Sequence, residues 1–467
     1  MGLRVFSCFR SWTVGEVRPK RKVCYRKKRK DSLPGKEAQI FDAETQEEAM
    51  KNVLVPLWRI PYYEQLQLKS QLVSEMVSKY YAVLQEDFSK PNTKRLVQLP
   101  PKPEIREICP SPVLYHYRTR DTYCVRPGLD GNPKTVGFAV ALKSWDKYVC
   151  VPPSDIISPP QHVQVAKAFQ DFIRLSPLPA YFQKKGNWSE LQVRSNVDGD
   201  TQALVRMHPQ ELTQHQIEDE CVRLRDYFKS GPGSDLQLSS LHFHPRPFKS
   251  SHWPKVVPYR QLFGDKHLIE KLSGLSFALS PGSFFQSNRN VAEIMYEKVI
   301  TAANLSSTTS VLDLGCGIGT ISILLASHVK ETVGIDVVQN AVEDARFNAS
   351  LNNIRSANFI SGTIEKEINL ALQWVQPSKD VVAVLNPGRC GVHVSLIKQL
   401  RESCQINKVI YISCDPDHTV VIRDVVALIK PEGRKALGTP FLFKSVTPFD
   451  MFPQTAHCEL VMVFERQ

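Results

Sequence analysis

The clearest pattern in the sequence is a regular exchange of strand-like and helix-like segments after residue 270. Short apolar runs read "SVLDLG", "TVGID", "ANFISG", "VVAVLNP" and "KVIYISC", and amphipathic stretches occupy residues 319–329, 338–352, 391–403 and 417–430. Continuous apolar runs are typical of strands buried on both faces, and their alternation with helices is typical of a parallel sheet. Residues 270–467 are therefore predicted to form an α/β domain with a doubly wound sheet.

Two further apolar segments, near residues 441–447 and 457–465, end the chain without a helix between them. Parallel neighbours in a sheet need a long crossover, whereas antiparallel neighbours need only a turn. One of these two strands must therefore run antiparallel to its neighbour. The prediction is a seven-stranded sheet with one antiparallel strand.

The first half of the chain has a different texture. Residues 44–90 place apolar side chains near helical spacing, which predicts a helical segment. Between about residues 113 and 250, short alternating runs such as "TVGFAVAL" and "KYVCV" predict strands, so residues 44–269 are expected to form an α+β region. The proline-rich stretches 94–115 and 242–255 are predicted to be connectors.

Almost all of the net charge lies in a basic leader, assigned to residues 1–43. The 467-residue chain has a formal net charge of +12, and residues 1–30 hold eleven basic residues against one acid, Glu16, which is +10 of that total. The rest of the chain is close to neutral. Its net charge therefore does not by itself indicate a nucleic-acid partner.

Three interpretations of the leader fit its residues. Residues 1–12 contain no acidic residue, and Arg4 and Arg10 lie among aromatic residues in this segment. This composition resembles a mitochondrial presequence. The run "PKRKVCYRKKRK" is also compatible with a nuclear localisation signal or a basic arm that contacts RNA phosphates. Localisation in the mitochondrial matrix is the leading prediction, with the nucleus as the alternative.

Composition excludes several classes of protein. A hydrophobic fraction of 42% and a charged fraction of 23% are ordinary for a globular chain, and no apolar run approaches the ~20 residues that cross a bilayer, so no membrane insertion is expected. The eleven cysteines form no C-x-x-C pair, so no metal is expected, and a chain of this length needs no disulfide framework. The sequence does not indicate the oligomeric state.

Candidate chemistry gathers where the predicted strands end, because ligands of open α/β sheets bind beyond the carboxyl ends of the strands. The first strand ends in "DLGCGIG", whose glycines, beginning with Gly315, permit a close backbone approach to a ligand. The second delivers Asp336, placed where an acid can accept hydrogen bonds from ribose hydroxyls. The turn has no lysine for a nucleotide phosphate, and a G-x-G turn with an upstream acid favours S-adenosylmethionine over NAD as the cofactor. A purely structural glycine turn is the alternative.

Three later strands deliver further polar residues to the same edge. The fourth ends in Asn386 of "NPGRCG", the fifth ends in Cys414 of "SCDP", and the last begins near Glu459 of "TAHCE". A lone cysteine is more often a core residue than a nucleophile. A thiol, a carboxylate and a methyl donor in one crevice together indicate one specific reaction.

Five blocks of the sequence, "SFFQSN", "DLGCGIG", "NPGRCG", "YISCDP" and "TAHCE", resemble in order and spacing the signature blocks of RNA uracil-5-methyltransferases. "SPVLYHYR" and "PLWRIPYYEQL" are similar to the eukaryotic branch of the tRNA (uracil-5-)-methyltransferases. The resemblance covers about residues 50–467. It implies a Rossmann-like methyltransferase domain that uses S-adenosyl-L-methionine to methylate C5 of uridine in RNA. The implied substrate is the T-loop of tRNA, and the sequence leaves open whether mitochondrial ribosomal RNA is a second substrate.

The resemblance also implies roles for individual residues. Cys414 is implied to be the nucleophile that adds to C6 of uracil, and Glu459 the base that then removes the C5 proton. The residues implied to bind the cofactor are Gln286, Gly315, Asp336 and Asn386. His457 is expected to position the strand that bears the base, or simply to pack.

One departure from the family pattern leaves alternatives open. Asn386 begins "NPGR" where the family usually has Asp-Pro-Pro-Arg, and an asparagine supplies no charge. Asp336 replaces the commoner glutamate, which is a milder change. The alternatives are an RNA-binding or RNA-folding protein with a decayed methyltransferase domain, and an RNA cytosine-5 methyltransferase, although "SCDP" lacks the usual Pro-Cys of the latter.

The N-terminal α+β region is expected to bind the RNA substrate. A target base in a folded loop must be flipped out before its C6 can be reached. Aromatic and basic residues of "YHYRTR", residues 115–120, can stack on bases and contact phosphates, although a core strand explains them as well.

Overall fold

The computed structural model describes residues 46–466, apart from residues 89–98, 129, 142–147, 155, 247–257, 376–379, 390 and 434–436. The chain divides into two compact units. Unit 1 comprises the residues up to Arg59 together with Val113–Glu270 and Ser280–Gly282, and unit 2 comprises Ile60–Pro112, Lys271–Leu279 and the residues from Ser283 onward. The predicted leader lies outside the described residues.

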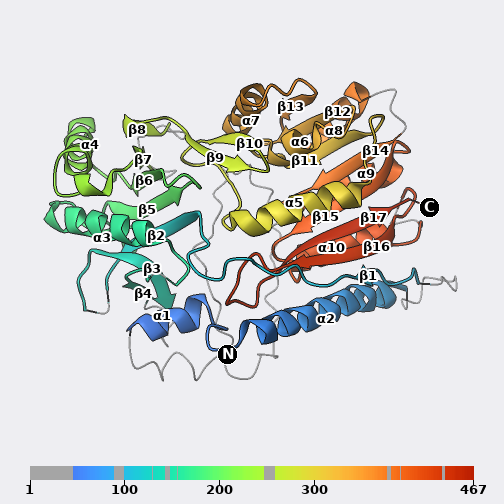
Figure 1. The fold of residues 1–467 in the computed structure, drawn as a ribbon, viewed down its shortest axis with the longest axis horizontal. Coiled ribbons are helices and arrows are strands. Elements are labelled where there is room, and N and C mark those ends of the chain that lie inside the picture. Colours follow the sequence, from blue (N-terminus) through green and yellow to red (C-terminus); the bar gives the residue numbers. More distant parts are fainter. Residues whose placement is uncertain are drawn as a thin grey trace. The chain divides into compact units, whose positions relative to one another are not determined.

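Unit 2 is built on an eight-stranded sheet with the strand order β1-β16-β17-β15-β14-β11-β12-β13 (Figure 1). The strands are β1 (Glu104–Ile105), β11 (Ser310–Leu314), β12 (Glu331–Asp336), β13 (Ala357–Ser361), β14 (Val381–Leu385), β15 (Ile406–Ser413), β16 (Leu442–Phe449) and β17 (Glu459–Glu465). β17 runs antiparallel to both β15 and β16, and the other pairs are parallel. The prediction of seven strands with one antiparallel strand is confirmed for β11 to β17, and β1 adds an eighth strand that the pattern does not predict.

Helices cover both faces of this sheet, as a doubly wound fold requires. One face carries α2 (Tyr62–Phe88), α8 (Ile364–Trp374), α9 (Val394–Glu402) and α10 (Thr419–Ile429), which share one apolar core with the strands. The other face carries α5 (Arg289–Ala303), α6 (Thr320–Leu325) and α7 (Gln339–Leu351). The four predicted helices correspond to α6, α7, α9 and α10, whereas α5 and α8 are additional helices.

The alternation along β11 shows how the sheet separates its two faces. Leu312 and Leu314 are buried in the core formed with α2, α8, α9 and α10. Asp313 points to the opposite face, where its Oδ2 accepts hydrogen bonds from the main-chain nitrogen and the hydroxyl of Ser322 on α6 at 3.0 and 2.7 Å. A buried carboxylate therefore fixes α6 at the mouth of the sheet.

The first proline-rich stretch is not a simple connector. Its described part includes β1, and the main-chain nitrogens of Arg106 and Cys109 donate to the carbonyl oxygens of Val446 and Pro448 at 2.9 and 2.8 Å. Helix α2 packs on α10 in the same unit. Residues 60–112 thus belong to unit 2, which differs from the domain boundaries that the sequence pattern suggests.

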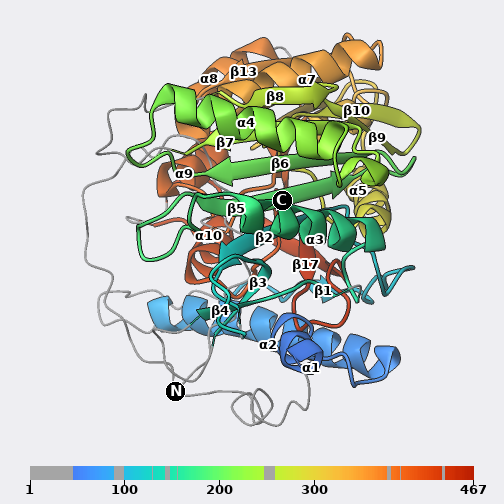
Figure 2. The ribbon, with the colours of Figure 1, turned by 90° about the vertical axis from the view of Figure 1, so that its left-hand side faces the viewer.

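Unit 1 contains a seven-stranded sheet with the order β4-β3-β2-β5-β6-β7-β8. Its strands are β2 (Arg120–Arg126), β3 (Thr135–Ala141), β4 (Tyr148–Val151), β5 (Trp188–Ser195), β6 (Thr201–Met207), β7 (Ser240–Pro245) and β8 (Arg260–Gly264). Helices α3 (Pro160–Leu175) and α4 (Gln214–Lys229) lie over one face, as Figure 2 shows. The predicted α+β character is confirmed.

The remaining elements are short or peripheral. Helix α1 (Gln46–Leu54) contacts β3 and β4, the 3-10 helix η1 (Ser234–Leu236) precedes β7, and β9 (Leu268–Leu272) pairs with β10 (Leu275–Leu279). The second predicted connector, residues 242–255, begins inside β7, and its residues 247–255 lie outside the described part of the chain. Among the described helices, none combines the length and the apolar character that a membrane span requires.

Candidate active site

The turn after β11 forms an open cradle of main chain. Gly315, Gly317 and Gly319 have φ angles of 97°, 54° and 83°, a region that residues with a Cβ atom rarely adopt. A Cβ atom on Gly315 would lie 3.3 Å from the carbonyl oxygen of Asn386, whereas a Cβ atom on Gly317 would meet no atom within 4 Å. The glycines therefore let a ligand approach the main chain closely at this edge of the sheet.

Asp336 ends β12 and fixes the shape of this cradle. Its Oδ2 accepts a hydrogen bond from the main-chain nitrogen of Gly317 at 2.9 Å, and its Oδ1 accepts one from Val338 at 2.8 Å. Burial raises the pKa of Asp336, and the backbone hydrogen bonds oppose that rise. Because a carboxylate oxygen has two lone pairs, Asp336 can hold the turn and still accept hydrogen bonds from hydroxyl groups of a ligand.

Asp313, the acid upstream of the glycines, lies beside the cradle and is not among the cofactor-binding residues that the resemblance implies. Its Oδ1 is buried, and none of the described residues donates a hydrogen bond to it. Burial raises the pKa of Asp313 to about 6, while the bonds from Ser322 oppose the rise. Its place at the start of "DLGCGIG" is the signal that could have identified it.

β15 and β17 bring the predicted thiol and carboxylate together. In their antiparallel pairing Ser413 lies opposite Leu460. The residue after Ser413 is Cys414 and the residue before Leu460 is Glu459, so the register sets these two side by side. Glu459 is 2% exposed and Cys414 is partly buried.

Burial dominates the electrostatics of this pair. Loss of solvation raises the pKa of Cys414 to about 12, and the nearby carboxylate of Glu459 acts in the same direction. Loss of solvation also raises the pKa of Glu459 to about 8. The positive charge of Arg389 lowers both pKa values, and its side chain also hydrogen-bonds to Cys414. Arg389 is thus the cation that favours the ionised form of each group.

Asn386 lies between the cradle and the thiol. It directly follows β14, the strand between β11 and β15, and its main-chain nitrogen donates to the carbonyl oxygen of Leu314 at 3.4 Å. Its side chain is partly buried. Asn386 and Arg389 both come from the "NPGRCG" block. This block departs from the family pattern at Asn386, but it also supplies Arg389, the cation beside Cys414.

Gln286 reaches the site from the segment before α5. It is 6% exposed, and a hydrogen bond between its side chain and the Tyr296 hydroxyl lowers the pKa of that tyrosine. Burial and the negative charges of Glu459 and Asp313 raise the pKa of Tyr296 above its usual range by a larger amount. The Tyr296 hydroxyl is therefore hydrogen-bonded to the predicted cofactor residue Gln286 and lies close enough to Glu459 to be affected by its charge.

The predicted site residues meet at one edge of the sheet in unit 2. β11, β12, β14 and β15 are parallel, so the residues that follow them share an edge, and β17 begins at that edge because it runs the other way. His457 is exposed, which differs from the alternative of a packed side chain, and its role in positioning the strand stays a prediction. Its main-chain nitrogen donates to Thr455 Oγ1 at 3.1 Å, and its ring meets that of Phe452 edge-to-face.

Comparison with known proteins also indicates a methyltransferase. Residues 305–445 match a family model described as a methyltransferase domain. The tRNA (uracil-5-)-methyltransferase homolog B of Danio rerio is 37% identical over 426 residues, which cover 90% of this chain and 87% of the relative. Homolog B of Homo sapiens is 36% identical, with 90% and 84% covered, and homolog A of Mus musculus is 33% identical, with 93% and 72% covered.

A solved structure supports the fold over most of the chain. The Pyrococcus abyssi tRNA (uracil-54, C5)-methyltransferase in complex with S-adenosyl-L-homocysteine superimposes with a TM-score of 0.60, at 20% identity, over 87% of this chain and 84% of that chain. The identity and coverage of the sequence relatives establish the family as well as the fold. With Cys414 set beside Glu459 next to a main-chain cradle, the chain belongs to the tRNA (uracil-5-)-methyltransferase family.

Proposed function

We propose that this protein methylates C5 of uridine in tRNA, with S-adenosyl-L-methionine as the methyl donor. The observation that carries the proposal is the pairing of β15 with β17, which sets a thiol beside a buried carboxylate at the edge that bears the glycine cradle. A thiol and a base are the two groups that substitution at C5 of a uracil requires. The names of the sequence relatives support tRNA as the substrate.

The residues at the cradle fit the cofactor. S-adenosyl-L-methionine supplies an electrophilic methyl group when bound. Asp336 can accept hydrogen bonds from ribose hydroxyls, and the buried Oδ1 of Asp313 can accept a further donor. The open space beside Gly317 leaves room for the ligand along the main chain, and the lack of a side chain at Gly315 lets the turn pack against the main chain of Asn386.

Cys414 starts the reaction in this proposal. C5 of uracil is a poor nucleophile, so the thiolate adds to C6, a C6–S bond forms, and the electrons of the C5=C6 double bond move onto the C4 carbonyl as an enolate. The enolate forms a bond through C5 to the methyl carbon, and the bond from that carbon to the donor's sulfonium sulfur breaks with its electrons left on sulfur. C5 then carries both the methyl group and its original proton. Arg389 favours the thiolate because it lowers the pKa of Cys414.

Glu459 completes the reaction. Its carboxylate accepts the proton from C5, the C5=C6 double bond re-forms, and the C6–S bond breaks to return the thiolate of Cys414. Burial raises the pKa of Glu459 to about 8, so its carboxylate is a stronger base than that of an exposed glutamate. The two residues therefore act at opposite ends of the same catalytic cycle.

A second candidate function rests on Asn386. If the loss of a negative charge at this position abolished methyl transfer, the protein would bind or fold RNA without modifying it. Transfer of a labelled methyl group to tRNA by the full chain would contradict this candidate. Binding of tRNA without any transfer would support it.

RNA binding by unit 1 is the further part of the proposal, and it is supported by a cavity in that unit. The cavity has a volume of about 310 Å³ and is lined by Lys51, Trp58, Tyr115, His116 and Ile156. Tyr115 is 52% exposed, and His116 has a φ angle of 53°, a conformation that is uncommon for residues other than glycine. Aromatic rings of this kind are stacking platforms for unpaired bases.

Two cations lie against the tryptophan ring of this cavity. Lys51 Nζ is 5.1 Å and the Arg59 guanidinium carbon is 4.6 Å from the centre of the Trp58 ring. They form ion pairs with Glu47 and Glu48 at 2.5 and 3.0 Å. Such partly exposed pairs contribute about 0–1 kcal/mol, so a phosphate group can replace either carboxylate at little cost.

The first prediction separates the two catalytic roles. Glu459→Gln should still add and methylate but should not eliminate, so a methylated enzyme–RNA adduct should accumulate on a denaturing gel, and kcat should fall roughly 100- to 10,000-fold. Cys414→Ala should form no adduct and transfer no methyl group, to tRNA or to mitochondrial ribosomal RNA. Cys404→Ala, at an exposed thiol, is the matched control and should behave as the unaltered protein. Normal turnover by Glu459→Gln would refute the assignment.

The second prediction concerns pH. Because the pKa of Glu459 is raised to about 8, the carboxylate that accepts the C5 proton is the minor form at neutral pH. Under conditions where proton removal limits kcat, kcat should rise about tenfold per pH unit below that pKa and level off above it. Turnover of saturating tRNA measured from about pH 6.5 to about pH 9 checks this. A kcat that falls over this range would show that Glu459 is not the base.

The third prediction concerns the cavity of unit 1. Trp58→Ala and Tyr115→Ala should each raise the KM for full-length tRNA roughly 5- to 150-fold and leave kcat nearly unchanged, because stacking contributes about 1–3 kcal/mol per base. Trp374→Ala is the matched control, since this tryptophan is 45% exposed on α8. An unchanged KM in both cavity variants would place RNA binding elsewhere.

The fourth prediction concerns the leader, for which we propose import into the mitochondrial matrix. Residues 1–30 carry a net charge of +10 and lie outside the described residues. A tagged protein that lacks residues 1–30 should lose its mitochondrial signal in cell fractionation and should still methylate tRNA in vitro. Retention of the truncated protein in mitochondria would overturn the targeting role, and nuclear accumulation of the full chain would support the alternative.

A further inference from the structure

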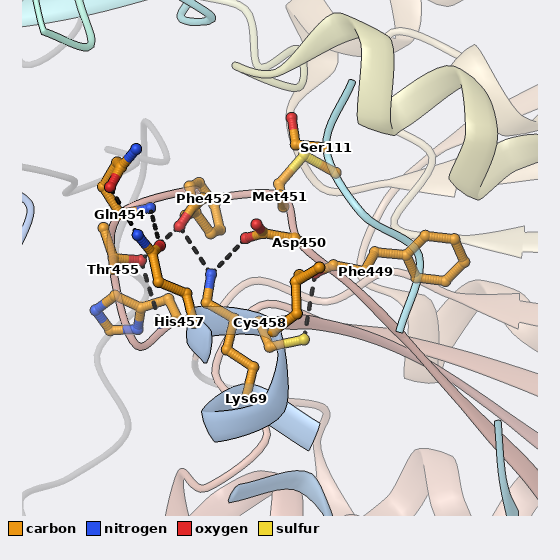
Figure 3. A network of polar contacts seen from close by, with 12 residues as sticks. Lys69, Ser111, Phe449, Asp450, Met451, Phe452, Gln454, Thr455, His457 and Cys458 are labelled. Atoms are coloured by element: carbon orange, nitrogen blue, oxygen red, sulfur yellow. Dashed lines mark hydrogen bonds and ion pairs between the residues drawn. The ribbon is translucent and has the colours of Figure 1, made fainter. Parts of the chain in front are cut away.

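The segment that delivers Glu459 is held from the side by helix α2 of the same unit. Residues 450–458 connect β16 with β17, and Glu459 is the first residue of β17. Figure 3 shows this connection surrounding the ammonium group of Lys69, which reaches up from α2. The polar contacts there involve buried side chains, which is unusual for a connection between two strands.

An ion pair lies at the centre of these contacts. Lys69 Nζ pairs with Asp450 Oδ1, and both side chains are 0% exposed. Lys69 Nζ also donates to the carbonyl oxygen of Phe452 at 3.0 Å. The Tyr62 hydroxyl donates to the other carboxylate oxygen of Asp450, Oδ2, at 2.8 Å. Both oxygens of Asp450 are thus held by α2.

A pair of glutamines fixes the connection at a second point. Gln65 Nε2 donates to Gln454 Oε1 at 2.8 Å, and the main-chain nitrogen of Gln454 donates back to Gln65 Oε1 at 3.0 Å. Gln454 has a φ angle of 69°, so its backbone holds an uncommon conformation. Gln65 and Gln454 are 1% and 3% exposed. The buried amides therefore hold the chain at this bend.

The three α2 residues are spaced for this role. Tyr62, Gln65 and Lys69 recur at intervals of three and four residues, so they share one face of the helix. Apolar residues at these three positions would stabilise the fold at least as much, because a buried ion pair gives little net stability compared with packed hydrophobic residues. What directional polar contacts add is a fixed geometry for the group they hold.

The rest of the connection is also tied down. Cys458 Sγ donates to the carbonyl oxygen of Phe449 at 3.2 Å, next to the Phe449–Glu459 strand pair. On the other side, Asn288 Nδ2 donates to the carbonyl oxygen of Met451 at 3.2 Å, and Asn288 caps α5 two residues after Gln286. The connection is therefore held against α2 and against the segment that carries Gln286.

From these contacts we propose that Lys69 and Asp450, with Tyr62, are positioning residues for the catalytic base. They do not contact the reacting atoms, and they act through residues 450–458 on the carboxylate of Glu459. This inference rests on the proposed function. Its consequence is specific to one step: a displaced Glu459 slows removal of the C5 proton, which follows methyl transfer, and leaves addition of Cys414 to C6 intact.

The test uses the full chain with the double substitution Lys69→Met and Asp450→Leu, which removes both buried charges together. The variant is expected to fold, to keep its KM values for tRNA and S-adenosyl-L-methionine, and to lose at least roughly tenfold in kcat. It should also accumulate the methylated enzyme–RNA adduct on a denaturing gel. A merely structural role would lower the amount of folded protein without trapping an adduct.

The matched control is the double substitution Lys408→Met and Glu465→Leu. Lys408 and Glu465 pair across β15 and β17 at 3.1 Å, at the opposite end of β17 from Glu459. This control should keep kcat and should trap no adduct. If it trapped as much adduct as the Lys69/Asp450 variant, the effect would come from loosening β17 in general and the proposal would be overturned.

A milder variant keeps the proposal testable if the double substitution does not fold. Tyr62→Phe removes only the hydroxyl that donates to Asp450 and should give a smaller loss of kcat together with a smaller yield of adduct. Normal kcat in Tyr62→Phe and in any folded double variant would overturn the inference. If Glu459→Gln trapped no adduct, the proposed function itself would be refuted. If Glu459→Gln trapped the adduct but the Lys69/Asp450 and Tyr62 variants did not, only the positioning role would be refuted.

Discussion

The antiparallel pairing of β17 with β15 is the constraint on which the candidate active site depends. A parallel strand presents its last residue at the ligand-binding edge, whereas β17 presents its first residue, Glu459, because it runs in the opposite direction. The pairing of Ser413 with Leu460 then sets Glu459 beside Cys414. A slip of one residue would turn the carboxylate to the other face of the sheet, so the hairpin between β16 and β17 must fix the register closely.

Burial gives the two groups of this pair their chemical character. Removing Glu459 from water raises its pKa to about 8 and makes its carboxylate a better proton acceptor. The same burial makes the Cys414 thiolate unfavourable, and Arg389 is the charge that opposes this effect. A thiol that stays largely protonated is also less open to oxidation, because the thiolate is the reactive form. The predicted site thus combines a carboxylate that accepts a proton more readily than an exposed one with a thiol that is mostly protonated.

Unit 2 includes residues 60–112, which are far in sequence from its other strands and helices. Helix α2 buries apolar residues, among them Val73, Val77 and Leu84, in the core of the large sheet, and β1 extends that sheet beside β16. The same helix presents Lys69 to the connection before Glu459. Residues 60–112 are therefore part of the unit that bears the predicted catalytic residues, and unit 1 is left with its own sheet, core and aromatic cavity.

The sequence alone determined the alternation of strands and helices, the antiparallel strand near the C-terminus, and the positions of Cys414 and Glu459 at strand ends. These features follow from local periodicity and chain direction, which a single sequence displays. Only the tertiary structure decided that residues 104–105 join the sheet, that Arg389 lies beside Cys414, and that Lys69 pairs with Asp450. Such contacts join residues far apart in the chain, and no local pattern records them, because their energies depend on burial and distance that exist only after folding.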